Sequence, residues 1–212
     1  MMKYPLQTLG CRSLLAVLLF LSSLPMLQAR IGESREAIER RLFASGGIVY
    51  RDDATEANRR RGMPYEKYLT FLPSSWDVRI YFKTADGSRP QSSNMDPRRM
   101  SPGWDMHVIY MRGQSKIEVY KRSTGITEYE MNALLAAHAD GSYWNKVDPK
   151  DKETKSMPSA FGFDMVRQDG TVRAKKLGGD SVMVFDAELD AQLAELNDAS
   201  LQSAAPASVN GF

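Results

Sequence analysis

His107 and His138 are the only two histidines in the chain, and the histidine imidazole is the commonest metal ligand in proteins. A zinc site needs three or four nitrogen, sulfur or oxygen ligands. The two histidines lie on a predicted strand and on a predicted helix that could pack over it, but the sequence offers no obvious third ligand. We therefore expect neither a metal site nor a cofactor.

Paired carboxylates are the second chemistry that these residue types allow. Glycoside hydrolysis needs two carboxyl groups about 5 Å or about 6.5 to 9.5 Å apart, and a sequence does not reveal that distance. The candidates are Asp105, Glu118, Glu128 and Glu130. The spacing of Glu130 is that of a helix-capping residue, and the position of Glu118 is that of an exposed strand face. A carboxylate-based hydrolase acting on cell-envelope polysaccharide or peptidoglycan stays an alternative function.

Other catalytic signatures are missing from the sequence. The serine motif G-x-S-x-G does not occur, and the glycines of LGGD at 177–180 lack the spacing of a phosphate loop or of a dinucleotide fingerprint. The run Arg59–Arg61 offers planar donors for a phosphate or a carboxylate. The neighbouring acids Asp52, Asp53 and Glu56 balance this run, which favours a solvated charged segment.

The first 29 residues have the pattern of a secretory signal peptide. Lys3 and Arg12 make the start positive, an apolar run follows at 14–24, and Ala29 occupies a suitable cleavage position. The apolar run is shorter than the roughly 20 residues that cross a bilayer. Cys11 precedes the run, where it cannot become the lipid-bearing first residue of a lipoprotein. We predict cleavage after Ala29 and export to the periplasm or the medium, without a stable membrane anchor.

Removing this leader also removes the net charge. Lys3 and Arg12 are two of the 28 basic residues, so the predicted mature chain has 26 basic and 26 acidic residues. A neutral domain gives no reason to expect a nucleic acid as partner. Because Cys11 is the only cysteine, the mature chain lacks disulfides, thiolate metal sites and cysteine nucleophiles.

The elements that must position these residues follow from hydrophobic spacing and turn residues. Ser34 is a suitable N-cap for the first helix. The predicted elements up to residue 122 are a helix at 35–44, a strand at 48–51, a polar connection at 52–75 that could contain some helix, a strand from residue 77, a proline-bearing loop at 89–103 and a hairpin at 104–122.

The stretch GITEYEMNALLAAHADGSYW at 125–144 has the clearest helix signal. Thr127 and Glu130 form the S/T-x-x-E capping box, and Gly141 follows the helix as its stop residue. The helix is predicted from about Glu128 to about Ala139, with one apolar stripe made by Met131, Leu134, Leu135 and His138. His138 therefore has the position of a packed residue rather than of a surface ligand.

The aromatic residues Tyr143 and Trp144 leave the end of this helix. Aromatic side chains bury large areas in cores and are also enriched at binding surfaces, so two interpretations stay open. Either the pair folds back to cover the sheet, or it forms a recognition surface. As candidate partner-binding residues we take Tyr143, Trp144 and His138.

The remainder of the chain predicts short strands in FGFDMVR, TVRAKKL and SVMVF, and then a helix capped by Asp186. The small, polar residues 199–212 predict a disordered tail. These elements indicate a single α+β domain at 30–198, with an antiparallel sheet and short amphipathic helices packed on one face. Their order also suggests two weakly similar halves, at 30–144 and 145–198.

Two stretches, RIGESREAIERRLFASGGIVYRDD and WDMHVIYMRGQSKIEVYKRSTGITEYEMNALLAAHADGSYW, resemble uncharacterised exported bacterial proteins of the Verrucomicrobia type. The resemblance implies an exported α+β domain and assigns no catalytic residue. A looser likeness links the helix-then-sheet order to the SmpA/OmlA outer-membrane lipoprotein modules, which act as assembly or scaffold partners. This chain departs from those modules because it lacks their lipid-bearing cysteine.

Together these observations predict an exported, non-catalytic domain that binds an unknown protein or envelope component. The envelope hydrolase is one alternative. An inhibitor of an extracellular enzyme is another, and it would require the loop at 89–103 to project as a rigid wedge.

Overall fold

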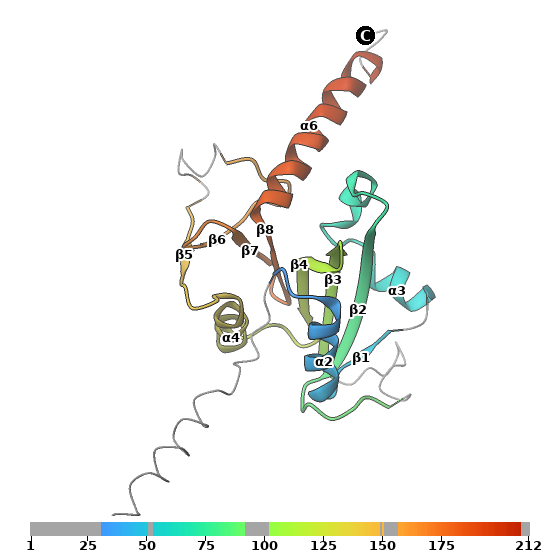
Figure 1. The fold of residues 1–212 in the computed structure, drawn as a ribbon, viewed down its shortest axis with the longest axis vertical. Coiled ribbons are helices and arrows are strands. Elements are labelled where there is room, and N and C mark those ends of the chain that lie inside the picture. The colour runs from blue at the N-terminus through green and yellow to red at the C-terminus, as the bar shows by residue number, and fades with distance from the viewer. Residues whose placement is uncertain (1–30, 51–52, 92–101, 149, 151–156, 209–212) are drawn as a thin grey trace, which may run out of the picture.

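The structure is a computed structural model, and it describes residues 31–50, 53–91, 102–148, 150 and 157–208 of the 212-residue chain. An eight-stranded sheet forms its centre, with the strand order β1-β2-β3-β4-β8-β7-β6-β5 (Figure 1). Every pair of neighbouring strands is antiparallel. The strands are β1 Ile48–Val49, β2 Trp76–Thr84, β3 Gly103–Met111, β4 Gln114–Arg122, β5 Trp144–Lys146, β6 Met165–Arg167, β7 Val172–Leu177 and β8 Ser181–Asp186.

Helices accompany the sheet, so the predicted α+β class with an antiparallel sheet is confirmed. They are α2 Arg35–Ala44, α3 Asp53–Arg60, the 3₁₀ helix η1 Glu66–Phe71, α4 Glu128–His138 and α6 Ala187–Ser208. No helix among the described residues is long and apolar enough to span a membrane.

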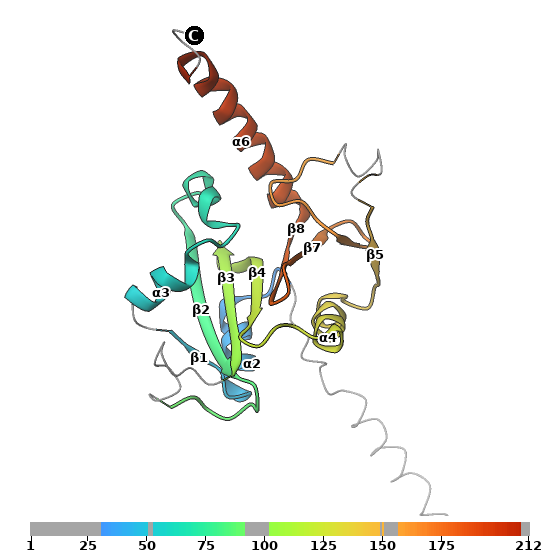
Figure 2. The ribbon, with the colours of Figure 1, turned by 180° about the vertical axis from the view of Figure 1, so that it is seen from behind.

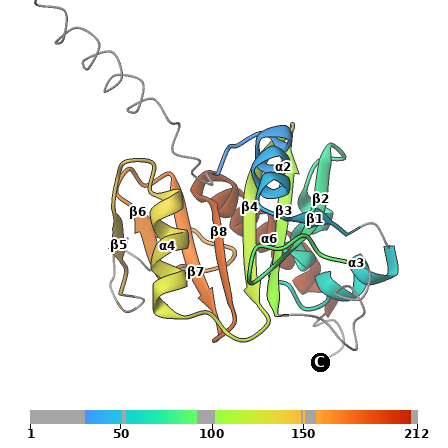
Figure 3. The same ribbon diagram turned by 90° about the horizontal axis from the view of Figure 1, so that it is seen from below.

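The sheet is covered on both faces. Alternating side chains of a strand point to opposite faces, so Val108 of β3 packs with Ile38 of α2 while Ile109 packs with Leu193 of α6. Helices α2 and α4 share one face, as predicted, and Figure 3 looks onto this side, which we call the α4 face. The structure adds a second layer on the opposite face, the α6 face, where α6 and η1 pack.

The local signals at the starts of α2 and α4 are confirmed. The hydroxyl of Ser34 accepts a hydrogen bond from the Ala37 N–H at 3.3 Å. At α4 the Thr127 hydroxyl accepts from the Glu130 N–H at 3.2 Å, and the Glu130 carboxylate accepts from the Thr127 N–H at 3.0 Å. This reciprocal pair satisfies two N–H groups that have no partner within the helix, so α4 begins where the capping box predicts.

The polar connection predicted at 52–75, in which the sequence leaves some helix open, contains helical structure. It forms α3 and η1, and Tyr65 and Tyr68 from its second half are buried in the core of the α6 face. The phenol rings supply apolar area to that core while their hydroxyls bond to His107 and to the carbonyl oxygen of Ala160.

The last helix is longer than predicted. Its start agrees with the sequence, because Asp186 accepts a hydrogen bond from the Leu189 N–H at 2.9 Å. However, α6 continues through 199–208, which the sequence predicts as part of a disordered tail, and it projects away from the sheet (Figures 1 and 2). Alanine and leucine have a high intrinsic helix propensity, because they lose little side-chain freedom in a helix even where nothing packs on them. Residues 209–212 of the predicted tail lie outside the described residues.

The chain contains one structural motif twice. A helix and four antiparallel strands occur as α2-β1-β2-β3-β4, with α3 and η1 inserted between β1 and β2, and again as α4-β5-β6-β7-β8, and the two units join through the β4–β8 pair. The second unit begins with α4 at Glu128. The division into weakly similar halves at 30–144 and 145–198 stays a prediction. Leu135 of α4 packs in one apolar cluster with Val172 and Val184, which belong to the strands after the helix.

Candidate binding groove along helix α4

A groove runs along one flank of α4, between the helix and strands β5 and β6. It consists of two hollows of about 520 and 490 Å³ that share Asn132 and Leu135. The first hollow has apolar side chains from Met131 and Met165, and the second is bordered by Tyr143 and Trp144. We call the two hollows together the α4 groove.

The end of α4 brings the predicted aromatic pair to this groove. Asp140 and Gly141 have left-handed φ angles of 51° and 77°, which turn the chain back alongside the helix to start β5. The Trp144 indole N–H donates to the carbonyl oxygen of Leu135 at 2.7 Å, which ties β5 to the helix. Trp144 thus has a structural contact and also lines the groove.

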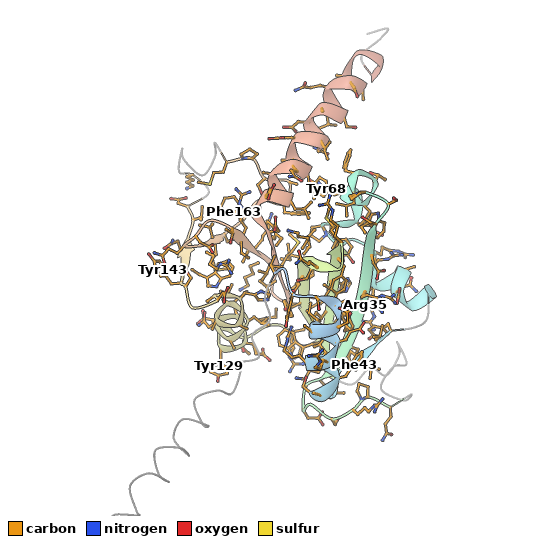
Figure 4. The ribbon with its side chains drawn as sticks, in the orientation of Figure 1. Arg35, Phe43, Tyr68, Tyr129, Tyr143 and Phe163 are labelled. Atoms are coloured by element: carbon orange, nitrogen blue, oxygen red, sulfur yellow. The ribbon has the colours of Figure 1, made fainter. Side chains whose placement is uncertain are left out.

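Tyr143 has a different environment from its neighbour. It is 56% exposed and lies on the outer side of the molecule beside β5 (Figure 4). It therefore does not cover the sheet, and of the three candidate partner-binding residues it offers the most accessible side chain.

His138 does not reach the groove. It is fully buried, so the structure corrects its candidacy as a residue that touches a partner. Its Nε2 lies 3.0 Å from the Tyr120 hydroxyl and 3.6 Å from the Glu118 carboxylate. Burial lowers the pKa of His138 to about 3, because the imidazolium form loses its hydration there.

Glu118 is a candidate catalytic carboxylate whose burial the strand pattern predicts wrongly. The sequence predicts it on an exposed face, yet it is fully buried, and it accepts a hydrogen bond of 2.5 Å from the Tyr120 hydroxyl. Burial raises the pKa of Glu118 to about 7. When the carboxylate is ionised, the Tyr120 hydroxyl donates its one hydrogen bond to Glu118. The hydrogen bond between Tyr120 and His138 is then donated by the Nε2–H of His138.

A separate polar cluster lies on the α6 face. Nδ1 of His107 is 2.7 Å from the Tyr65 hydroxyl, and Asp105 accepts hydrogen bonds from Arg59 at 2.7 Å and from Tyr50 at 3.2 Å. Arg59 also stacks over Tyr50. Arg59 is therefore not part of a solvated charged run, because it neutralises an almost buried carboxylate 46 positions away.

The catalytic groupings considered from the sequence do not assemble. His107 faces the α6 face and His138 packs on the α4 face, so the sheet separates the two imidazoles. Within the described part of the chain, no group of three or more His, Cys, Asp or Glu side chains could hold a metal ion.

The four candidate carboxylates are also dispersed. Asp105 and Glu118 lie on opposite faces of the sheet, Glu130 caps α4, and Glu128 lies at the rim of the α4 groove. The loop that would form an inhibitory wedge is described only at its ends, because 92–101 lie outside the described residues.

Comparisons with known proteins add no relative: no family model, no curated protein and no solved structure matches the chain. Any function must therefore be argued from the site itself.

Proposed function

We propose that this protein is an exported, non-catalytic domain that binds a protein or envelope component in the α4 groove. The observation that carries the proposal is the groove itself, which combines apolar walls with the exposed ring of Tyr143. Tyrosine and methionine are enriched in protein interfaces, where tyrosine supplies a large, rigid contact surface.

Binding fits the described residues better than hydrolysis does. Carboxylate catalysis requires two carboxyl groups on either side of one scissile bond. The buried acid with the raised pKa, Glu118, is enclosed with Tyr120 and His138 rather than facing a cleft with a second carboxylate. Through Tyr120 and His138 it connects β4 to α4 inside the protein.

The export part of the proposal is tested separately. Expression of the full chain in its source cell, followed by mass spectrometry of the purified protein, should find a mature N-terminus at Arg30 in the periplasm or the medium. A cytoplasmic chain that retains Lys3 and Arg12 would contradict export.

Affinity capture from an envelope extract tests the binding groove. We expect the protein to retain one or more specific partners, and Tyr143→Ala to reduce the recovered amount at least tenfold. Tyr129→Ala is the matched control, because Tyr129 is 83% exposed on α4 and does not line the groove. Equal recovery with the two variants would place any binding elsewhere, and release of sugar or peptide fragments would favour a hydrolase.

A further inference from the structure

Strand β5 forms one outer edge of the sheet (Figures 1 and 2). Its other side pairs with β6 in an antiparallel register. The Tyr143 carbonyl oxygen accepts from the Gln168 N–H at 3.0 Å, and the Val147 N–H donates to the Asp164 carbonyl oxygen at 2.9 Å. Antiparallel pairing alternates, so residues 143, 145 and 147 direct their backbone groups toward β6.

The intervening residues, Trp144 and Lys146, therefore direct their N–H and C=O groups to the open edge. Their side chains lie on the α4 face, because both residues line the α4 groove. The edge thus presents a row of backbone donors and acceptors directly beside an apolar hollow. Such an edge is a template for pairing with another strand.

We propose that the partner of the α4 groove is an extended protein segment that pairs with β5 as an additional strand. This inference rests on the proposed function and names the class of its partner. Backbone hydrogen bonds to Trp144 and Lys146 would hold the segment, and every second side chain of the segment would enter the groove toward Met131, Leu135 and Met165.

Charge selects among such segments. Lys146, on the edge strand itself, lines the sheet side of the groove, and its ammonium forms no ion pair with another described residue. A segment that alternates apolar residues with Asp or Glu complements both features. Two acidic residues also line the first hollow, and both lie inward of the open edge: Glu128 is on the helix side, and Asp164 precedes β6, where its carboxylate accepts a hydrogen bond from the Lys176 backbone N–H at 2.8 Å.

Substitutions at one residue separate the backbone contribution from that of the side chain. Lys146→Pro removes an N–H that faces the open edge, and proline is tolerated on edge strands. Lys146→Ala removes the same ammonium but keeps the N–H, so it is the matched control. We expect the captured amount of partner to fall at least tenfold with Lys146→Pro, and by less than about fivefold with Lys146→Ala, as for one exposed ion pair.

Thermal unfolding of the two variants checks their folding, and amide hydrogen exchange of the unaltered protein gives a second measurement that needs no substitution. In the captured complex, the N–H groups of Trp144 and Lys146 should gain protection. No gain at these two amides would overturn strand addition.

The outcomes distinguish this inference from the function on which it rests. Partner capture that depends on Tyr143 but is equal in Lys146→Pro and Lys146→Ala would overturn strand addition and leave the binding groove in place. Loss of capture with both variants would assign recognition to the ammonium and also overturn strand addition. If the unaltered protein captures no partner, both proposals fail together.

Discussion

At the residue scale, the buried Glu118–Tyr120–His138 cluster combines two opposite effects of burial. Glu118 has a pKa raised from 4.5 to about 7, so its contribution to stability is complete below pH 4.5 and is lost as the pH rises through 7. His138 has a pKa lowered from 6.5 to about 3, so its contribution is present above pH 6.5 and is lost as the pH falls through 3. Between pH 4.5 and 6.5, Glu118 is protonated only in the folded state and His138 only in the unfolded state. Their contributions to the pH dependence of stability therefore cancel.

This compensation predicts the pH dependence of two variants. In Glu118→Gln the histidine is no longer offset, so the free energy of unfolding should fall more steeply than in the unaltered protein as the pH drops from 6.5 to 4.5. The additional slope is one proton, or about 1.4 kcal/mol per pH unit. In His138→Gln the glutamate is no longer offset, so the slope should change by a similar amount in the opposite direction, toward a free energy of unfolding that rises as the pH drops. Urea unfolding at several pH values measures both, and equal slopes in all three proteins would contradict the cluster.

At the element scale, α4 is held on the sheet by one packed stripe. Leu135 is buried against Val172, Ala174 and Val184, so Leu135→Ala should leave a cavity and lower the free energy of unfolding by about 2 to 5 kcal/mol. Leu201→Ala is the control, because Leu201 is 62% exposed on α6 and should change stability little. Denaturant unfolding decides this, and a loss below about 1 kcal/mol at Leu135 would be evidence against the packed stripe.

The sequence predicts α4 well because its signals are local. Thr127 and Glu130 are three residues apart, and Asp140 and Gly141, which turn the chain, follow shortly after the helix end. The burial of Glu118 has no local signal, since it depends on α4 returning over β4 through His138, 20 positions later. Long-range contacts also explain why the partner of Asp105 could not be predicted. A polar residue within a strand that is covered on both faces offers no pattern that separates burial from exposure.

At the scale of the whole molecule, the two helix-plus-four-strand units share one sheet, and their helices lie on the same face. The projecting half of α6 is not part of either unit. Because 199–205 are exposed, deletion of 199–212 should change the free energy of unfolding by less than about 1 kcal/mol. Urea unfolding of the shortened chain tests this, and a loss above about 2 kcal/mol would show that the end of α6 packs on the domain.

The same scale explains where a partner can bind. Strand β5 of the second unit forms an open edge of the sheet, and the groove beside α4 lies next to that edge. The sequence indicates the aromatic pair at this edge, but it does not reveal that Lys146 and Met165 from separate strands complete the same surface. Such a surface depends on strand order, which hydrophobic periodicity does not encode.

The most direct test of the binding groove is photo-crosslinking in the source cell. p-Benzoylphenylalanine replaces Tyr143 in one full-length chain and Tyr129 in another, and the covalent adducts are compared after irradiation. We predict a discrete adduct with a protein at position 143 and none at position 129. An adduct of equal yield at both positions, or no adduct at position 143, would contradict a partner-binding site in the α4 groove.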